Sequence, residues 1–135
     1  MPVDGLQPSQ LFICAEKLAV VERALDGAGG VLREPLPVKR LDGRIVLTDG
    51  HTRALAALCS GAQTVPVYWD MDDLDWDAYR ICVDWCLKAG VRTVGDLRTR
   101  VIPARAYDVQ WLERCRAMQE RLTDKRKSCR DPGAA

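Results

Sequence analysis

Between residues 44 and 61 the chain reads Arg44-Ile45-Val46-Leu47-Thr48, then Asp49-Gly50, then His51-Thr52-Arg53-Ala54-Leu55-Ala56-Ala57-Leu58-Cys59-Ser60-Gly61. The first five residues are β-prone, whereas the run after Gly50 consists mainly of good helix formers and stops at a glycine. A strand, a tight turn and a helix therefore follow one another without a spare residue. Because the first N–H groups of a helix lack intrahelical partners and lie at the positive end of its dipole, this turn is a natural anion site.

The side chains of the turn suit a phosphate ligand. Gly50 allows the backbone to approach the ligand closely, and Arg53 and Thr52 supply a bidentate guanidinium and a hydroxyl donor. His51, the single histidine, is able to donate to a phosphate or to transfer a proton. Asp49 either caps the helix or orients a ligand hydroxyl or a metal-bound water. The alternative is an ordinary strand–turn–helix in which Asp49 is only a cap and Arg53 only a surface charge.

The flanking segments extend this unit to an α/β core. Leu36–Leu41 and Arg44–Thr48 predict a β-hairpin, because Asp42-Gly43 between them is a strong signal for a two-residue turn. Residues 14–26 predict an amphipathic helix from apolar residues at helical spacing. Thr64–Trp69 predicts a further strand, which Pro66 places at a sheet edge or interrupts.

Beyond Asp70 the pattern becomes helical. Apolar residues at helical spacing predict a helix over 74–88, a short one over 94–100 and a longer one from Ala104 to about Lys125, and residues 131–135 have the composition of a frayed tail. We therefore expect a core over residues 1–70 and a helical C-terminal extension over 71–130 that packs on the same core.

Composition limits the class of protein. The chain has 135 residues, 47% of them hydrophobic and 29% charged, and no apolar run approaches the length of a membrane span. No secretory signal is visible and the six cysteines are not set in close loops, so we expect reduced thiols, a cytoplasmic location and no membrane partner. The net charge is only +1, but residues 70–84 are acidic and 114–130 basic, so the two stretches face one another or different partners.

Several residues in this order resemble the ParB/sulfiredoxin superfamily. The similarity covers roughly residues 6–70 and rests on Leu6-Gln7-Pro8-Ser9-Gln10, a helix, Pro35-Leu36-Pro37-Val38, Asp42-Gly43, Val46 to Ala54, and Val65-Pro66-Val67. It implies a small mixed sheet with helices, of the α/β (α+β) class. It also implies that the Gly-x-x-Arg turn binds nucleotide phosphates, as it does for CTP in ParB proteins, ATP in sulfiredoxins and ATP or ADP in the free serine kinases.

The turn is most similar to that of the kinases. Sulfiredoxins have a reactive cysteine where this chain has His51, and ParB proteins usually have an arginine where it has Thr52. The kinases also use a glutamate base from the N-terminal region, and the resemblance makes Glu16 the positional candidate. A glutamate in a first helical turn also interacts favourably with the helix dipole, so Glu16 has a purely structural alternative.

Three other features have a structural explanation beside a functional one. Cys82 and Cys86 share one helical face, but further metal ligands are missing nearby, which favours buried thiols and no metal site. The four tryptophans form either an aromatic ligand wall or part of the core. The basic run at 125–127, with Arg121 and Arg130, is either a solvated helix end or a nucleic-acid contact, and nucleic acid is not excluded as a partner.

The leading hypothesis is a nucleotide-binding ParB-like protein that acts as an ATP- or ADP-dependent phosphotransferase on a small-molecule acceptor, with Mg²⁺. Its candidate phosphate-binding residues are Gly50, His51, Thr52 and Arg53, and its candidate catalytic residues are Asp49, His51 and Glu16. The alternative is a non-catalytic regulatory or adaptor module that binds a partner protein or DNA, which predicts a large exposed apolar or charged patch on residues 74–125. A domain that keeps the fold but binds no nucleotide is a third reading.

Overall fold

The predicted hairpin forms the centre of the main sheet. In the computed structural model, which describes residues 1–130, β2 (Leu36–Leu41) pairs antiparallel with β3 (Arg44–Leu47), and Leu41 lies opposite Arg44. Asp42 and Gly43 connect the strands with φ of 51° and 80°, the left-handed pair that a type I′ turn requires. The predicted C-terminal tail, residues 131–135, lies outside the described residues.

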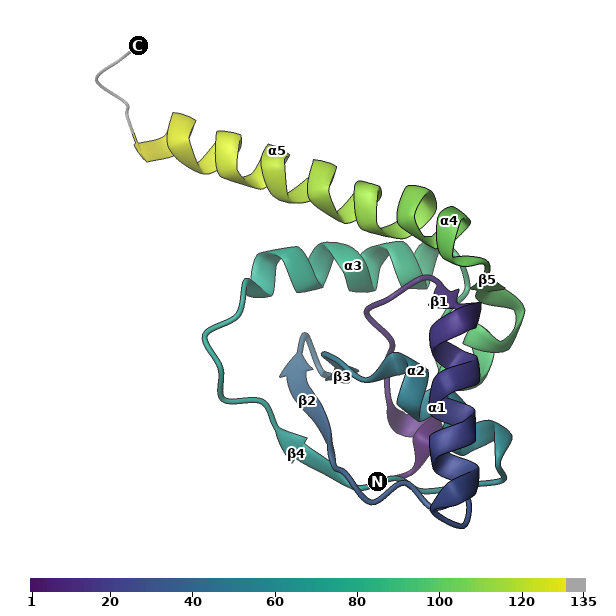
Figure 1. Cartoon of the computed structure of the whole chain (residues 1–135). Helices are drawn as coiled ribbons and strands as arrows, with labels where there is room; N and C mark the ends of the chain where they lie inside the picture. The colour runs from purple at the N-terminus through teal and green to yellow at the C-terminus, as the bar shows by residue number, and fades with distance from the viewer. Residues whose placement is uncertain (131–135) are drawn as a thin grey trace.

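The third strand completes a mixed sheet. β4 (Val67–Trp69) pairs parallel with β2 on its other side, which gives the strand order β3-β2-β4 (Figure 1). It begins directly after Pro66, as expected for a residue that has no N–H to donate, and it is an edge strand. A second, two-stranded sheet joins β1 (Ile13–Cys14) and β5 (Val101–Ile102) in parallel and so connects the two halves of the chain.

The described residues, 1–130, form five α-helices beside the strands. The bounds are α1 (Ala15–Gly27), α2 (His51–Cys59), α3 (Trp76–Lys88), α4 (Ala104–Tyr107) and α5 (Glu113–Arg130). Helices α1 and α2 pack against each other, and α5 runs along α3 and extends past the core (Figure 1). A π-helical turn, η3 (Asp108–Leu112), joins α4 to α5, so the single helix predicted from Ala104 contains one widened turn. Two 3₁₀ segments, η1 (Val3–Gly5) and η2 (Val94–Arg100), complete the described fold.

The main core takes side chains from both halves of the sequence. Leu6, Ile13, Leu36 and Leu55 from the N-terminal half are fully buried, and they share one cluster with Leu97, Cys86, Trp111 and Met118. A smaller cluster of Leu41, Val46 and Val83 lies at the other side of the hairpin. The fold is therefore of the α+β class, with small mixed sheets and a helical C-terminal extension, which confirms the predicted class.

The acidic and basic stretches face one another at one point. The guanidinium of Arg126 on α5 donates to both carboxylate oxygens of Asp75, at 2.8 and 3.0 Å, and lies 3.6 Å from Asp77. Asp75 also caps α3 by accepting from the N–H of Ala78 at 3.2 Å. The cap and the ion pair together tie the start of α3 to the C-terminal part of α5. Within the described part of the chain, no helix has the length and apolar character that crossing a bilayer demands.

Candidate functional site

Buried hydrogen bonds hold the strand that leads into the turn. Thr48 follows β3, and its hydroxyl donates to the carboxylate of Asp70 at 2.8 Å. Its backbone oxygen accepts from the hydroxyl of Tyr79 at 3.1 Å. Just before it, the backbone oxygen of Leu47 accepts from the hydroxyl of Ser9 at 2.7 Å. Two loops and helix α3, from three parts of the chain, therefore fix the position of the residues before Gly50.

Gly50 has a left-handed backbone conformation, which only glycine adopts easily. It is the N-cap of α2 with φ of 77° and ψ of 24°. A Cβ atom at this position would lie 2.7 Å from Nη2 of Arg53 and 2.8 Å from Cδ2 of Leu36. No side chain caps the helix, so Asp49 does not make the cap that one reading of the sequence assigned to it. The first amides of α2 therefore face the turn without a protein side-chain acceptor, as an anion site requires.

Arg53 lies in the first turn of α2 and is only lightly restrained. One guanidinium nitrogen is 3.4 Å from a carboxylate oxygen of Glu34, whose side chain is 84% exposed. A single exposed ion pair of this length contributes little free energy. An anionic ligand that binds Arg53 bidentately would therefore displace Glu34 at small cost.

His51 is buried and neutral. Its Nε2 accepts a hydrogen bond from the backbone N–H of Ser9 at 3.0 Å, so the proton of the neutral ring is on Nδ1. Burial lowers the pKa of His51 to about 4, and the negative charge of Asp49 opposes this only in part. As a neutral ring, His51 is able to donate to a ligand through Nδ1 alone.

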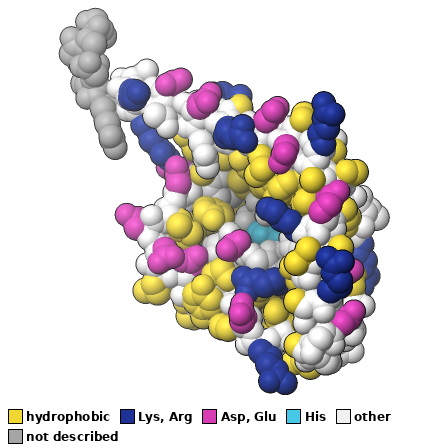
Figure 2. Space-filling view, viewed as in Figure 1, with side chains coloured by type: hydrophobic (Ala, Val, Ile, Leu, Met, Phe, Trp, Pro, Cys, Tyr) yellow, Lys and Arg dark blue, Asp and Glu magenta, His cyan; other side chains and the backbone are white. Residues whose placement is uncertain are grey.

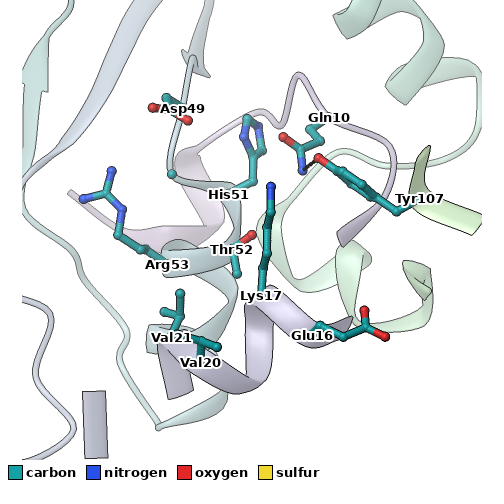
Figure 3. A pocket seen from close by; sticks show the side chains of 11 residues that line it. Gln10, Glu16, Lys17, Val20, Val21, Asp49, His51, Thr52, Arg53 and Tyr107 are labelled. Carbon is teal, nitrogen blue, oxygen red and sulfur yellow. Dashed lines mark hydrogen bonds between the residues drawn. The ribbon is translucent and has the colours of Figure 1, made fainter. Parts of the chain in front are cut away.

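The two candidate carboxylates lie on different segments beside the same pocket. Asp49 is exposed next to the turn, and Glu16 is exposed at the start of α1, where it accepts from the thiol of Cys14 at 3.4 Å. Hydrogen bonds from its own backbone N–H and from that thiol lower the pKa of Glu16, so it is ionised near neutral pH. In the view of Figure 3 the two carboxylates lie on opposite sides of the pocket, with His51 and Lys17 between them.

The turn opens into a pocket of about 500 Å³. Figure 2 shows the chain's one histidine at the floor of a hollow, with basic side chains at its rim. All six candidate residues contribute to the lining, which consists of Gln10, Glu16, Lys17, Val20, Val21, Asp49, Gly50, His51, Thr52, Arg53 and Tyr107. The structure thus brings together Glu16 and residues 49–53.

Three polar residues of this pocket were not singled out from the sequence. Lys17 extends from α1 toward His51, with its ammonium 5.8 Å from the centre of the Tyr107 ring (Figure 3). Gln10 donates to the hydroxyl of Tyr107 at 3.1 Å, which closes one side of the pocket with a residue from the C-terminal half. Nothing in the local sequence distinguishes Lys17 from other surface lysines, and the contact between Gln10 and Tyr107 spans 97 positions.

The cysteines of α3 and most of the tryptophans contribute to the hydrophobic core. Cys82 and Cys86 are both buried on α3, and burial raises the pKa of the Cys86 thiol to about 12. Within residues 1–130 no three metal-ligating side chains come together. Trp111 is buried and packs edge-to-face on Trp85 with ring centres 6.1 Å apart, whereas Trp69 is 53% exposed. The tryptophans therefore do not form one ligand wall.

The similarity found by comparison with known proteins is to solved structures. No family profile and no curated protein matches the chain. Among solved structures, it is similar to the C-terminally truncated chromosome-partitioning protein ParB from Caulobacter crescentus, which was crystallised with the centromeric parS site. The identity is 18% and the TM-score 0.42, and the match covers 78% of this chain. The chain spans just under two thirds, 65%, of the length of that ParB chain.

Proposed function

We propose that this chain binds a nucleotide through its phosphate groups at the Gly50–Arg53 turn and transfers a phosphoryl group to a small-molecule acceptor. The observation that supports this most directly is the uncapped start of α2, which follows a left-handed glycine and opens into a pocket of about 500 Å³. Pockets of this size hold ligands of the size of a nucleotide or drug. The resemblance of residues 6–70 to ParB-like nucleotide-binding domains favours a nucleotide over a simple anion.

The phosphate contacts follow from the charges around the turn. The amides at the start of α2 and the hydroxyl of Thr52 donate to phosphate oxygens, and Arg53 adds a bidentate contact. Lys17 reaches the same pocket from α1 and provides a second cation on the facing side. His51 contributes a neutral donor through Nδ1. This set binds phosphate oxygens without placing an unpaired charge in the core.

Transfer requires a base and compensation for the charge of the phosphates. Asp49 is the carboxylate next to the turn and is the proposed acceptor of the proton from the acceptor hydroxyl, with Glu16 as the second candidate. A Mg²⁺ ion that arrives with the nucleotide is held by the phosphates and by several water ligands that it keeps, so it does not require Asp49 as a direct ligand. When bound, such an ion neutralises negative charge on the phosphates.

The first test is binding. We expect ATP, ADP, CTP or GTP with Mg²⁺ to raise the melting temperature and to give a saturable calorimetric isotherm, and Arg53→Ala to remove both effects. Arg23→Ala is the matched control, because Arg23 is exposed on α1 outside the pocket lining. The proposal is wrong if none of the four nucleotides binds at millimolar concentration with or without Mg²⁺.

A second test separates catalysis from binding. Asp49→Asn removes the proposed base but keeps the size of the side chain, so we expect nucleotide affinity within a few fold of wild type and a large loss of phosphoryl transfer or nucleotide hydrolysis. Glu16→Gln is measured beside it. If neither substitution lowers turnover while binding is intact, the carboxylates have no catalytic role, and a nucleotide-binding regulatory module is the better description.

The adaptor function has its own supporting observation. Tyr68, Trp69 and Met71 are 50%, 53% and 85% exposed on and just after edge strand β4. This apolar patch lies before the 74–125 range in which a partner surface was expected. An edge strand with exposed apolar side chains is suited to accept an extended peptide as a fourth strand. Selection of binding peptides from a library tests it, with loss of binding in Trp69→Ser as the expected result and retained binding as the contrary one.

A further inference from the structure

A second cavity, of about 350 Å³, lies between the core and the helices α3 and α5. It shares two lining residues, Gln10 and His51, with the pocket at the phosphate turn. The two cavities therefore adjoin at these two residues. Most of the other residues that line the second cavity have no role in the proposed nucleotide site.

The cavity has one apolar side and one polar side. Its apolar side is lined by Ala78 and Cys82 of α3, by Trp111 of η3, and by Cys115 and Met118 of α5. The polar side contains Ser9 and Thr48, whose hydroxyl protons are already donated to Leu47 and Asp70. Their oxygens and the amide oxygen of Gln10, whose Nε2 already donates to Phe12 and Tyr107, remain able to accept hydrogen bonds from a ligand. The amide of Gln119 is able to accept or donate. A ligand of this cavity thus needs an apolar body and one polar end.

The charges around the cavity exclude most acids. Among the residues that line it, Asp75 is the one carboxylate, and Arg126 holds it bidentately at 2.8 and 3.0 Å. His51 is neutral, and the guanidinium of Arg114 stacks on the Trp85 ring, 4.1 Å from its centre, outside the lining. No cation in the lining is thus free to pair with a ligand carboxylate. An anion in the cavity would lose its hydration without compensation.

We propose that this cavity binds the phosphoryl acceptor, a small uncharged molecule with an aromatic or branched aliphatic body and one hydroxyl group. Its hydroxyl lies beside Gln10 and His51, where the two cavities meet, toward the phosphate turn. In the transfer step, the hydroxyl oxygen forms a bond to the terminal phosphorus, the bond from that phosphorus to the leaving nucleoside diphosphate breaks, and the hydroxyl proton passes to Asp49. The acceptor role rests on the proposed function, whereas binding of the uncharged molecule does not.

The test uses two probes that differ in charge. Benzyl alcohol and benzoate are titrated into ¹⁵N-labelled protein, and the indole N–H signal of Trp111, assigned with Trp111→Phe, reports on the cavity. We expect benzyl alcohol to shift this signal saturably in the millimolar range and benzoate to bind at least about tenfold more weakly, the equivalent of about 1.4 kcal/mol. Equal binding of benzoate, or no shift at Trp111, would overturn the proposal.

Filling the cavity checks the location. Ala78→Leu adds volume to the apolar side and is expected to abolish the benzyl alcohol shift, and Cys115→Phe does the same from α5 if the first variant does not fold. Ala19→Leu, at an exposed position of α1 outside both cavities, is the control that keeps binding. Retained binding in both filled variants places the probe elsewhere and contradicts the proposal.

Two further measurements separate this inference from the proposed function. Arg53→Ala is expected to abolish nucleotide binding and to leave the affinity for benzyl alcohol unchanged. If nucleotides do not bind but benzyl alcohol does, the proposed function is wrong and the uncharged-ligand site stands. If both bind, we expect saturating nucleotide to change the affinity for benzyl alcohol at least about twofold through the two residues that both cavities share, and the absence of any such change contradicts the acceptor role.

Discussion

The backbone N–H of Ser9 donates to Nε2 of His51 at 3.0 Å, across 42 positions of sequence. A backbone N–H donates a hydrogen bond and cannot accept one. This contact therefore requires the unprotonated nitrogen of a neutral imidazole. Ser9 also donates its hydroxyl to the backbone oxygen of Leu47. One loop residue therefore holds both the end of β3 and the first residue of α2, on either side of Gly50. The phosphate turn is positioned by this N-terminal loop.

We expect His51 to make stability depend on pH. Its pKa is about 4 when folded against an ordinary value of 6.5, so between these values the unfolded chain binds the proton and the folded protein does not. Stability contributed by the neutral ring is therefore complete above pH 6.5 and falls as the pH drops toward 4, by about 3 kcal/mol in total. Urea unfolding at several pH values measures it. His51→Gln keeps an acceptor for Ser9 and should lack this slope, and an identical slope in both proteins would contradict the prediction.

Substitution of Gly50 tests the geometry of the turn. Gly50→Ala places a Cβ in a left-handed conformation and within 2.8 Å of the buried Leu36 side chain, so we expect a loss of about 2–4 kcal/mol. Gly43→Ala is the matched control, because Gly43 has φ of 80° but no atom within 4 Å of its Cβ position. It should lose only about 1 kcal/mol, from backbone strain alone. Equal losses in chemical denaturation would show that crowding at Gly50 is unimportant.

The sequence predicted those features that depend on neighbouring residues. Asp42-Gly43 determined the register of the hairpin, and Gly50 the start of α2, because both turns need a positive φ that glycine adopts easily. The clustering of residues 49–53 follows from the same locality, since five consecutive residues at one turn cannot lie far apart. Glu16 is different, and only the resemblance placed it near the turn.

The remaining features depend on contacts between distant segments. Pairing of β1 with β5 involves two residues on each strand, too few to give an alternating pattern. Tyr107 reaches the pocket because the C-terminal helices pack on the N-terminal core, and the helical stripe that contains it indicated burial but not a partner. The low pKa of His51 likewise comes from burial by segments that a linear pattern does not bring together.

Arg126→Met should loosen α5. The substitution removes the guanidinium from Asp75 and Asp77 but keeps an unbranched side chain. We expect faster amide exchange in α5 near residue 126 and at the start of α3, with little change at α2. Because the pair is partly exposed, the difference from wild type should shrink in 1 M NaCl. Lys127→Met, a neighbouring exposed position, is the control, and equal effects of the two substitutions would rule out a specific tie.

The bond between Thr48 and Asp70 should link the phosphate turn to the loop after β4. Thr48 donates its hydroxyl to buried Asp70 at 2.8 Å, and the other carboxylate oxygen accepts from the N–H of Asp72 at 3.0 Å. A hydrogen bond to a buried carboxylate contributes about 1.5–3 kcal/mol. In a double-mutant cycle of Thr48→Val and Asp70→Ala, we expect a coupling of about 1–3 kcal/mol in the free energy of unfolding.

Because Thr48 precedes Asp49, each single variant should also weaken nucleotide binding severalfold at temperatures where it is fully folded, whereas Thr123→Val on exposed α5 should not. Additive losses, with a coupling below about 0.5 kcal/mol, would mean that the two segments hold their positions independently.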